Sequence, residues 1–113
     1  MKNMHALAEE YVLEAYGIGS DTKNYEILCM LPATVEEVME KLSLTKMPAN
    51  RRLNLLLDAG LISWQKGTSE IKSGPFTKPF LKSVKLMQKY VYEHGRAGLL
   101  EEIVRRSIIS GKA

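Results

Sequence analysis

The sequence predicts a mainly α-helical domain that contains one small β-hairpin. Apolar residues recur at three- and four-residue spacing over most of the chain, and they alternate with polar residues only between about residues 61 and 72. The chain has 113 residues, 45% of them apolar, which is enough for one domain with its own core. We therefore expect a single domain over residues 1–113, composed of an N-terminal helix (1–20), a central motif (21–73) and C-terminal helices (78–110).

The cysteine count and the lack of long apolar runs bear on the compartment. Cys29 is the one cysteine, so an intramolecular disulfide is impossible, which is typical of a reducing compartment. No apolar run approaches the roughly 20 residues that span a bilayer, and residues 1–10 carry charge where a signal peptide is apolar. We expect a cytoplasmic protein.

Charge is distributed unevenly along the chain. Residues 1–40 have a net charge of −6 and residues 41–90 a net charge of +8, within a total of +3. Clustered lysine and arginine displace condensed counterions from phosphate, so the basic block indicates a polyanion contact. A solvated helical face explains the same charges, and charge alone does not separate the two interpretations.

Helix boundaries can be read from breakers and caps. A first helix ends at Gly17, and a second begins at the cap Asp21 and ends before Pro32. A third begins at Thr34, where Glu37 completes a capping box. After the turn Ser43-Leu44-Thr45, a fourth helix begins at the cap Thr45 and ends at Ala59-Gly60. It is expected to bury Ala49, Leu53, Leu56 and Leu57.

The pattern changes after Gly60. Leu61–Gln65 and Glu70–Lys72 read as two short strands joined by a loop that contains Gly67. From Phe80 the spacing returns to three and four, and a last amphipathic helix follows Gly95. The apolar positions of this last helix are Leu99, Leu100, Ile103, Val104 and Ile108.

Two helices joined by a three-residue turn and followed by a basic hairpin have the order of a winged helix-turn-helix. The stretch 34–45, then Asn50-Arg51-Arg52-Leu53 and "LLLDAGLI" (55–62), resembles the helix-turn-helix of ArsR-like and MarR-like transcriptional regulators. The resemblance covers about residues 25–72 and implies that the fourth helix is a DNA recognition helix. The flanking helices resemble in layout those through which such proteins dimerise.

The fourth helix offers polar residues for a DNA groove. If its apolar residues face the core, the 100° step leaves polar side chains outward near its N-terminus. Arginine can bond a guanine edge and asparagine an adenine edge with paired hydrogen bonds. In the hairpin loop, Lys66 and Thr68 are placed to contact the DNA backbone. The candidate DNA-binding residues are Thr45, Lys46, Met47, Asn50, Arg51, Arg52, Asn54, Lys66 and Thr68.

Neither catalysis nor metal binding has a supporting motif. Cys29 stands among apolar neighbours, where a thiol is usually an inert small hydrophobe, and neither His5 nor His94 is near it in sequence. ArsR-like metal sensors bind through clusters of cysteines, or of histidines and carboxylates, and no such cluster with ligand spacing is present. We expect neither an enzyme nor a bound metal or cofactor.

The sequence predicts a sequence-specific double-stranded DNA-binding regulator of transcription that acts as a homodimer on a palindromic site. The alternative is a winged-helix module that docks a protein partner and leaves DNA untouched. For the dimer we expect the apolar residues of the terminal helices to meet across a two-fold axis. These residues are Met4, Leu7, Tyr11, Phe80, Val84, Met87 and Val91. The sequence names no small-molecule effector.

Overall fold

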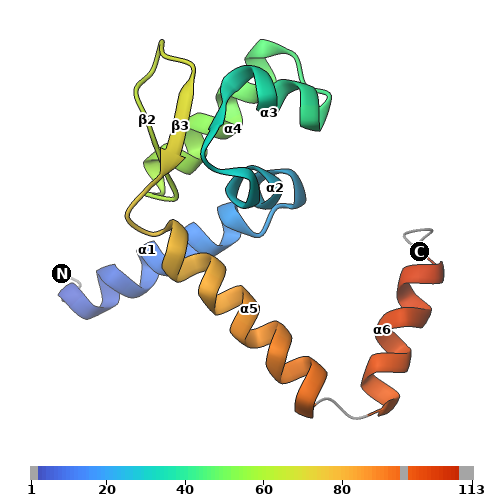
Figure 1. Ribbon diagram of the computed structural model, residues 1–113. Helices are drawn as coiled ribbons and strands as arrows, with labels where there is room; N and C mark the ends of the chain where they lie inside the picture. Colours follow the sequence, from blue (N-terminus) through green and yellow to red (C-terminus); the bar gives the residue numbers. More distant parts are fainter. Residues whose placement is uncertain (1–2, 95–96, 110–113) are drawn as a thin grey trace. The chain divides into compact units, whose positions relative to one another are not determined.

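The structure, a computed structural model, describes residues 3–94 and 97–109 (Figure 1). This part of the chain is mainly helical and has a small antiparallel sheet, as predicted. The elements are α1 (Met4–Gly19), α2 (Thr22–Met30), β1 (Ala33–Thr34), α3 (Val35–Leu42), α4 (Lys46–Asp58), β2 (Ile62–Trp64), β3 (Glu70–Ser73), α5 (Thr77–His94) and α6 (Ala97–Ile109). No described helix is both long and apolar enough to cross a membrane.

The chain divides into two compact units, Met1–Leu81 and Lys82–Ala113, and the boundary between them falls within the residues of α5. The first unit holds α1 to α4, the sheet and the first turn of α5. The second holds the rest of α5 and α6. The predicted C-terminal segment 78–110 extends past Ile109 by one residue, Ser110, which lies outside the described residues.

Local capping interactions set the starts of α2 and α3 where the sequence predicts them. Helix α1, in contrast, continues past its expected end at Gly17 and ends at Gly19. The Asp21 carboxylate accepts from the amides of Lys23 and Asn24 at the start of α2. At α3 the Thr34 hydroxyl accepts from the Glu37 amide at 3.1 Å, and the Glu37 carboxylate accepts from the Thr34 amide at 3.0 Å. These bonds confirm the predicted caps Asp21 and Thr34. Thr45, the third predicted cap, is the N-cap of α4 but makes no side-chain cap bond.

The end of α4 is a glycine-dependent turn. Gly60 has φ +74, and the amides of Gly60 and Leu61 donate to the carbonyls of Leu57 and Leu56. This is the paired bonding of a Schellman motif, which satisfies carbonyls that the helix leaves free. The turn directs the chain into β2, and it confirms the predicted helix end.

The sheet has three strands in the order β1-β3-β2, one more than predicted. Ala33 pairs with Ile71 and Thr34 with Glu70, while the Val35 amide donates to the Ser69 carbonyl at 2.8 Å. With two residues, β1 is too short to show an alternating pattern in the sequence. It ties the start of α3 to the hairpin.

The core of the first unit forms around the inward face of α4. Ala49, Leu53 and Leu56 are fully buried, and α4 packs against α1, α3 and β2. Leu57, which we expected to be buried, is only partly so. The inward faces of the other elements supply Ile27, Leu28, Val38, Ile62 and Ile71.

The environment of Phe80 also differs from the prediction. We expected it at a dimer surface, but it is 4% exposed within its own chain. Its ring lies against Gly19, where an added Cβ would come within 2.7 Å of the ring, and it makes an edge contact with Tyr16 at 5.0 Å. Phe80 therefore anchors the start of α5 to the first unit and has little surface left for a second copy.

Cys29 differs from the expectation as well. It is exposed and not enclosed by the apolar residues that surround it in sequence. The buried positions of α2 are Asn24, Ile27 and Leu28, and the next residue is turned 100° away from that face. An apolar sequence neighbourhood is a poor guide to burial at the edge of a helix.

Replacing Leu53 by alanine tests the inward face of α4. The side chain is 0% exposed, so the substitution removes buried apolar surface and leaves a cavity. We expect the free energy of unfolding to fall by about 2–5 kcal/mol, measured by chemical or thermal denaturation. The same change at Leu55, which is 50% exposed, is the control and should cost much less. Equal destabilisation at the two positions would show that the inward face is wrongly assigned.

Candidate nucleic-acid interface

The first half of α4 presents polar side chains to solvent. Lys46 and Arg51 are exposed, and the Met47 side chain is 68% exposed. This follows from the burial of Ala49, Leu53 and Leu56, since the remaining positions of an α-helix then point outward. Three of the predicted DNA-binding residues on α4 are thus accessible to a ligand.

The loop between β2 and β3 is held in a defined shape beside α4 (Figure 1). The Thr68 amide and hydroxyl both donate to the Gln65 carbonyl, at 3.0 and 2.6 Å. The Trp64 indole donates to the Thr68 carbonyl at 3.0 Å, and Gly67 has φ +90. These bonds use the Thr68 hydroxyl proton inside the loop, and they leave Lys66 exposed near its tip.

A groove of about 280 Å³ separates α4 from this loop. Both sides of it carry residues predicted from sequence to bind DNA. Five of the nine line it, namely Lys46, Asn50, Asn54, Lys66 and Thr68. The other lining residues are Val35, Glu36, Trp64, Gly67 and Ser69. The fold therefore brings α4 and the hairpin loop together at one groove, and the sequence had no signal for the presence of Glu36 or Trp64 in its lining.

Asn54, one of the residues that line the groove, has a buried polar atom without a partner. Its Oδ1 accepts no hydrogen bond from any described residue, and an unsatisfied buried acceptor costs about 1–3 kcal/mol. Lys46 and Lys66 also line the groove, and their charges favour an anionic ligand.

Arg52 departs from its predicted role. Its Nη1 donates to Asp21 Oδ1 at 2.6 Å and to Asn24 Oδ1 at 3.0 Å. Asn24 is buried, and its Nδ2 donates in turn to the Ile18 carbonyl at 3.0 Å. Arg52 thus fastens α4 to α2 and is a structural residue more than a groove residue. The signal in the sequence for this contact was Asp21, the aspartate that caps the start of α2.

The two hydrogen bonds from α2 amides and the Arg52 guanidinium also change the pKa of Asp21. The amide of Asn24 is the largest cause that holds the pKa of Asp21 below its ordinary value, and the charge of Arg52 adds to it. Partial desolvation opposes both. The ionised carboxylate is thereby favoured in the folded state.

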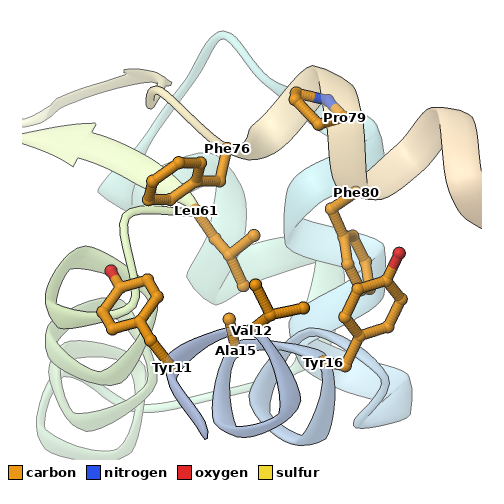
Figure 2. A pocket seen from close by; sticks show the side chains of 8 residues that line it. All are labelled: Tyr11, Val12, Ala15, Tyr16, Leu61, Phe76, Pro79 and Phe80. Atoms are coloured by element: carbon orange, nitrogen blue, oxygen red, sulfur yellow. The ribbon is translucent and has the colours of Figure 1, made fainter. Parts of the chain in front are cut away.

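An apolar hollow of about 230 Å³ lies elsewhere in the first unit (Figure 2). In Figure 2, Tyr11 and Phe76 stand on one side, Tyr16 and Phe80 on the other, and Val12, Ala15 and Leu61 lie between them. Pro79 completes the lining. The Tyr11 hydroxyl donates to the Asp58 carbonyl at 3.4 Å, so the hollow adjoins the end of α4.

The predicted dimer residues other than Phe80 are on the surface or near it. On α1, Met4 is 80% exposed, and Leu7 and Tyr11 are nearly half exposed. In the second unit Met87 is 65% exposed, Val91 is exposed and Val84 is half-buried. On α6, Ile103 and Val104 are exposed, whereas the side chains of Leu99, Leu100 and Ile108 lie outside the described residues.

Within residues 3–94 and 97–109, no three side chains of histidine, cysteine, aspartate or glutamate are grouped so that they could hold a metal ion. No protein-family model matches the chain, and no curated protein or solved structure is significantly similar to it. The site must therefore be interpreted from its own residues.

Replacing Asp21 by asparagine tests the link between α2 and α4. Asparagine keeps the capping oxygen but loses the charge that faces Arg52. The variant should be less stable than the parent at pH 7, by up to about 1 kcal/mol because the pair is partly exposed. A carboxyl with a lowered pKa stabilises the fold above its unfolded pKa, and that contribution disappears as the pH falls through the folded pKa.

The stability difference between parent and variant should therefore shrink as the pH falls below about 4, the range in which the carboxyl becomes protonated. Urea unfolding at several pH values measures it. A difference that stays constant from pH 7 to pH 2 would mean that the Asp21 charge does not stabilise the fold.

Proposed function

We propose that the chain is a winged helix-turn-helix protein that binds double-stranded DNA in a sequence-specific manner and regulates transcription as a homodimer. In this assignment α3 and α4 are the helix-turn-helix, α4 is the recognition helix, and the β2–β3 hairpin is the wing. The activity is binding, without catalysis or a cofactor.

The observation that carries the proposal is the groove between α4 and the wing loop. It brings together Lys46, Asn50 and Asn54 from the helix and Lys66 from the loop. A DNA-binding helix needs side chains that reach base edges, and it needs nearby cations that fix the duplex through its phosphates. Asparagine and Arg51 suit the first task, and the two lysines suit the second.

The charge distribution supports DNA over a protein partner for this surface. Residues 41–90 hold ten basic side chains against two acidic ones. A module that docks a protein has no need of so large an excess of positive charge. The phosphate backbone of DNA, in contrast, attracts lysine and arginine side chains. Glu36, the one acidic residue that lines the groove, is at the first turn of α3, where a carboxylate also stabilises the helix.

The exposed apolar residues of α1 and α5 support a homodimer. A monomer gains nothing by exposing Met4, Leu7 and Met87, and a second copy would cover them. A two-fold axis would hold two recognition helices apart, so that they can enter successive major grooves about 34 Å apart on a palindromic site. Two half-site contacts that are each weak then give a much tighter overall affinity for the palindromic site.

Alanine substitutions at the groove test the DNA-binding assignment. On the preferred duplex, Asn50→Ala and Arg51→Ala should each cost about 1–3 kcal/mol of binding and relax the preference at one base position. Lys66→Ala should weaken binding to all sequences alike, because phosphate contacts carry no base information. Lys23→Ala removes the same charge from α2 and is the control. Fluorescence anisotropy with a panel of duplexes measures these effects.

Equal weakening by all three groove variants on every sequence would mean that Asn50 and Arg51 touch only phosphate. Binding unaffected by any of them would contradict the assignment and favour the protein-docking alternative.

The dimer is tested with a charge placed in the apolar seam of α5. Met87→Glu should convert a particle with the mass of two chains into one with the mass of a single chain, since a buried unpaired carboxylate is costly. Tyr92→Glu is the matched control, because Tyr92 is 81% exposed and lies off the seam. Light scattering at micromolar concentration decides. A parent protein with the mass of one chain, or equal behaviour of the two variants, would contradict the dimer.

A further inference from the structure

Helix α5 has a second face that the groove and the dimer do not use. Lys82, Lys85 and Lys89, all in the second unit, are exposed and are spaced by three and four residues. At 100° per residue they fall within an arc of roughly 60°, and they extend over about 10 Å of helix. The apolar positions Val84, Met87 and Val91 lie on the roughly opposite side. We call these three lysines the lysine stripe.

The lysine stripe is unfavourable for the helix that carries it. Lysines at i and i+4, or i and i+3, repel one another, and this repulsion destabilises the helix. Among the described residues, Glu93 lies 3.9 Å from Lys89, and no carboxylate is within salt-bridge distance of the other two lysines.

A local conflict between sequence and structure of this kind is expected at functional sites. An extended polyanion removes it, because each phosphate offsets the repulsion between neighbouring lysines. Lysine is a flexible point charge that binds phosphate without demanding one geometry. A linear row of such charges is suited to a linear backbone.

We propose that the lysine stripe binds the phosphodiester backbone of duplex DNA and adds sequence-independent contacts to those of the groove. The inference rests on the proposed function, since it assigns the same ligand to a second surface. An anionic membrane is disfavoured, because a helix lying on a membrane buries its apolar face in the lipid. In the proposed dimer that face of α5 is covered by the second copy.

The test uses the full chain and compares two double variants with equal loss of charge. Lys82→Gln/Lys85→Gln alters the stripe, and Lys23→Gln/Lys41→Gln removes two exposed lysines from α2 and α3. Binding to a duplex of 30 base pairs is measured over a range of salt concentrations. The stripe variant should lower the slope of log K against log [salt] by about 0.9 for each phosphate that it no longer neutralises. Its ranking of duplex sequences should stay that of the parent.

The control variant should keep nearly the parent slope. Both variants should remain folded by circular dichroism, and the stripe variant should melt no lower than the parent because the substitutions relieve repulsion. Equal slopes for the stripe variant and the parent, or equal reductions in the two double variants, would overturn the inference. So would binding to vesicles of phosphatidylcholine and phosphatidylserine that depends on Lys82 and Lys85 while the DNA slope does not change.

The inference and the proposed function can fail separately. If Asn50→Ala and Lys66→Ala leave DNA binding intact but the stripe variant reduces the slope, the groove assignment is wrong and the stripe stands. If the groove variants weaken binding and the stripe variant does not change the slope, the groove assignment stands and the lysine stripe does not bind DNA. A parent protein that binds no duplex overturns both.

Discussion

The burial of one face of α4 is the constraint on which the rest of the structure depends. Ala49, Leu53 and Leu56 are withdrawn from water against α1, α3 and β2, and this fixes the rotation of the helix about its axis. Hydrogen bonds from Arg52 to Asp21 and Asn24 also help to hold α4 in this orientation. At the C-terminal end, Gly60 turns the chain directly into the hairpin. The outward residues of α4 and the wing loop are consequently placed by the core.

The candidate binding groove follows from this packing. Lys46, Asn50 and Asn54 share its helical side only because the helix cannot rotate, and Lys66 faces them only because the hairpin follows the turn at Gly60. The loop is stiffened by bonds from Trp64 and Thr68, so less conformational freedom disappears when a ligand binds. A rigid surface with separate positions for base and phosphate contacts is what sequence-specific binding requires.

Local signals in the sequence were sufficient to predict most of the helix ends. The features that they did not predict depend on packing between residues far apart in the sequence. The capping box of Thr34 and Glu37 and the glycine after α4 act within a few residues, so they can be recognised without tertiary information. Strand β1 exists only because β3 lies beside it. Phe80 is buried by Gly19, 61 residues earlier, and Arg52 is bound by Asp21 on another helix. The spacing of residues within one helix or strand gives no information about such contacts between elements.

We propose that DNA binds in the groove formed by α4 and the wing loop. The change in backbone amide chemical shifts when a duplex selected from random sequences is added to ¹⁵N-labelled protein tests this directly. We expect the largest changes in the first half of α4, around Lys46 to Arg51, and in the loop from Lys66 to Ser69, with little change at the buried end of α4. Changes confined to α1 and α6, or none at saturating duplex, would contradict it.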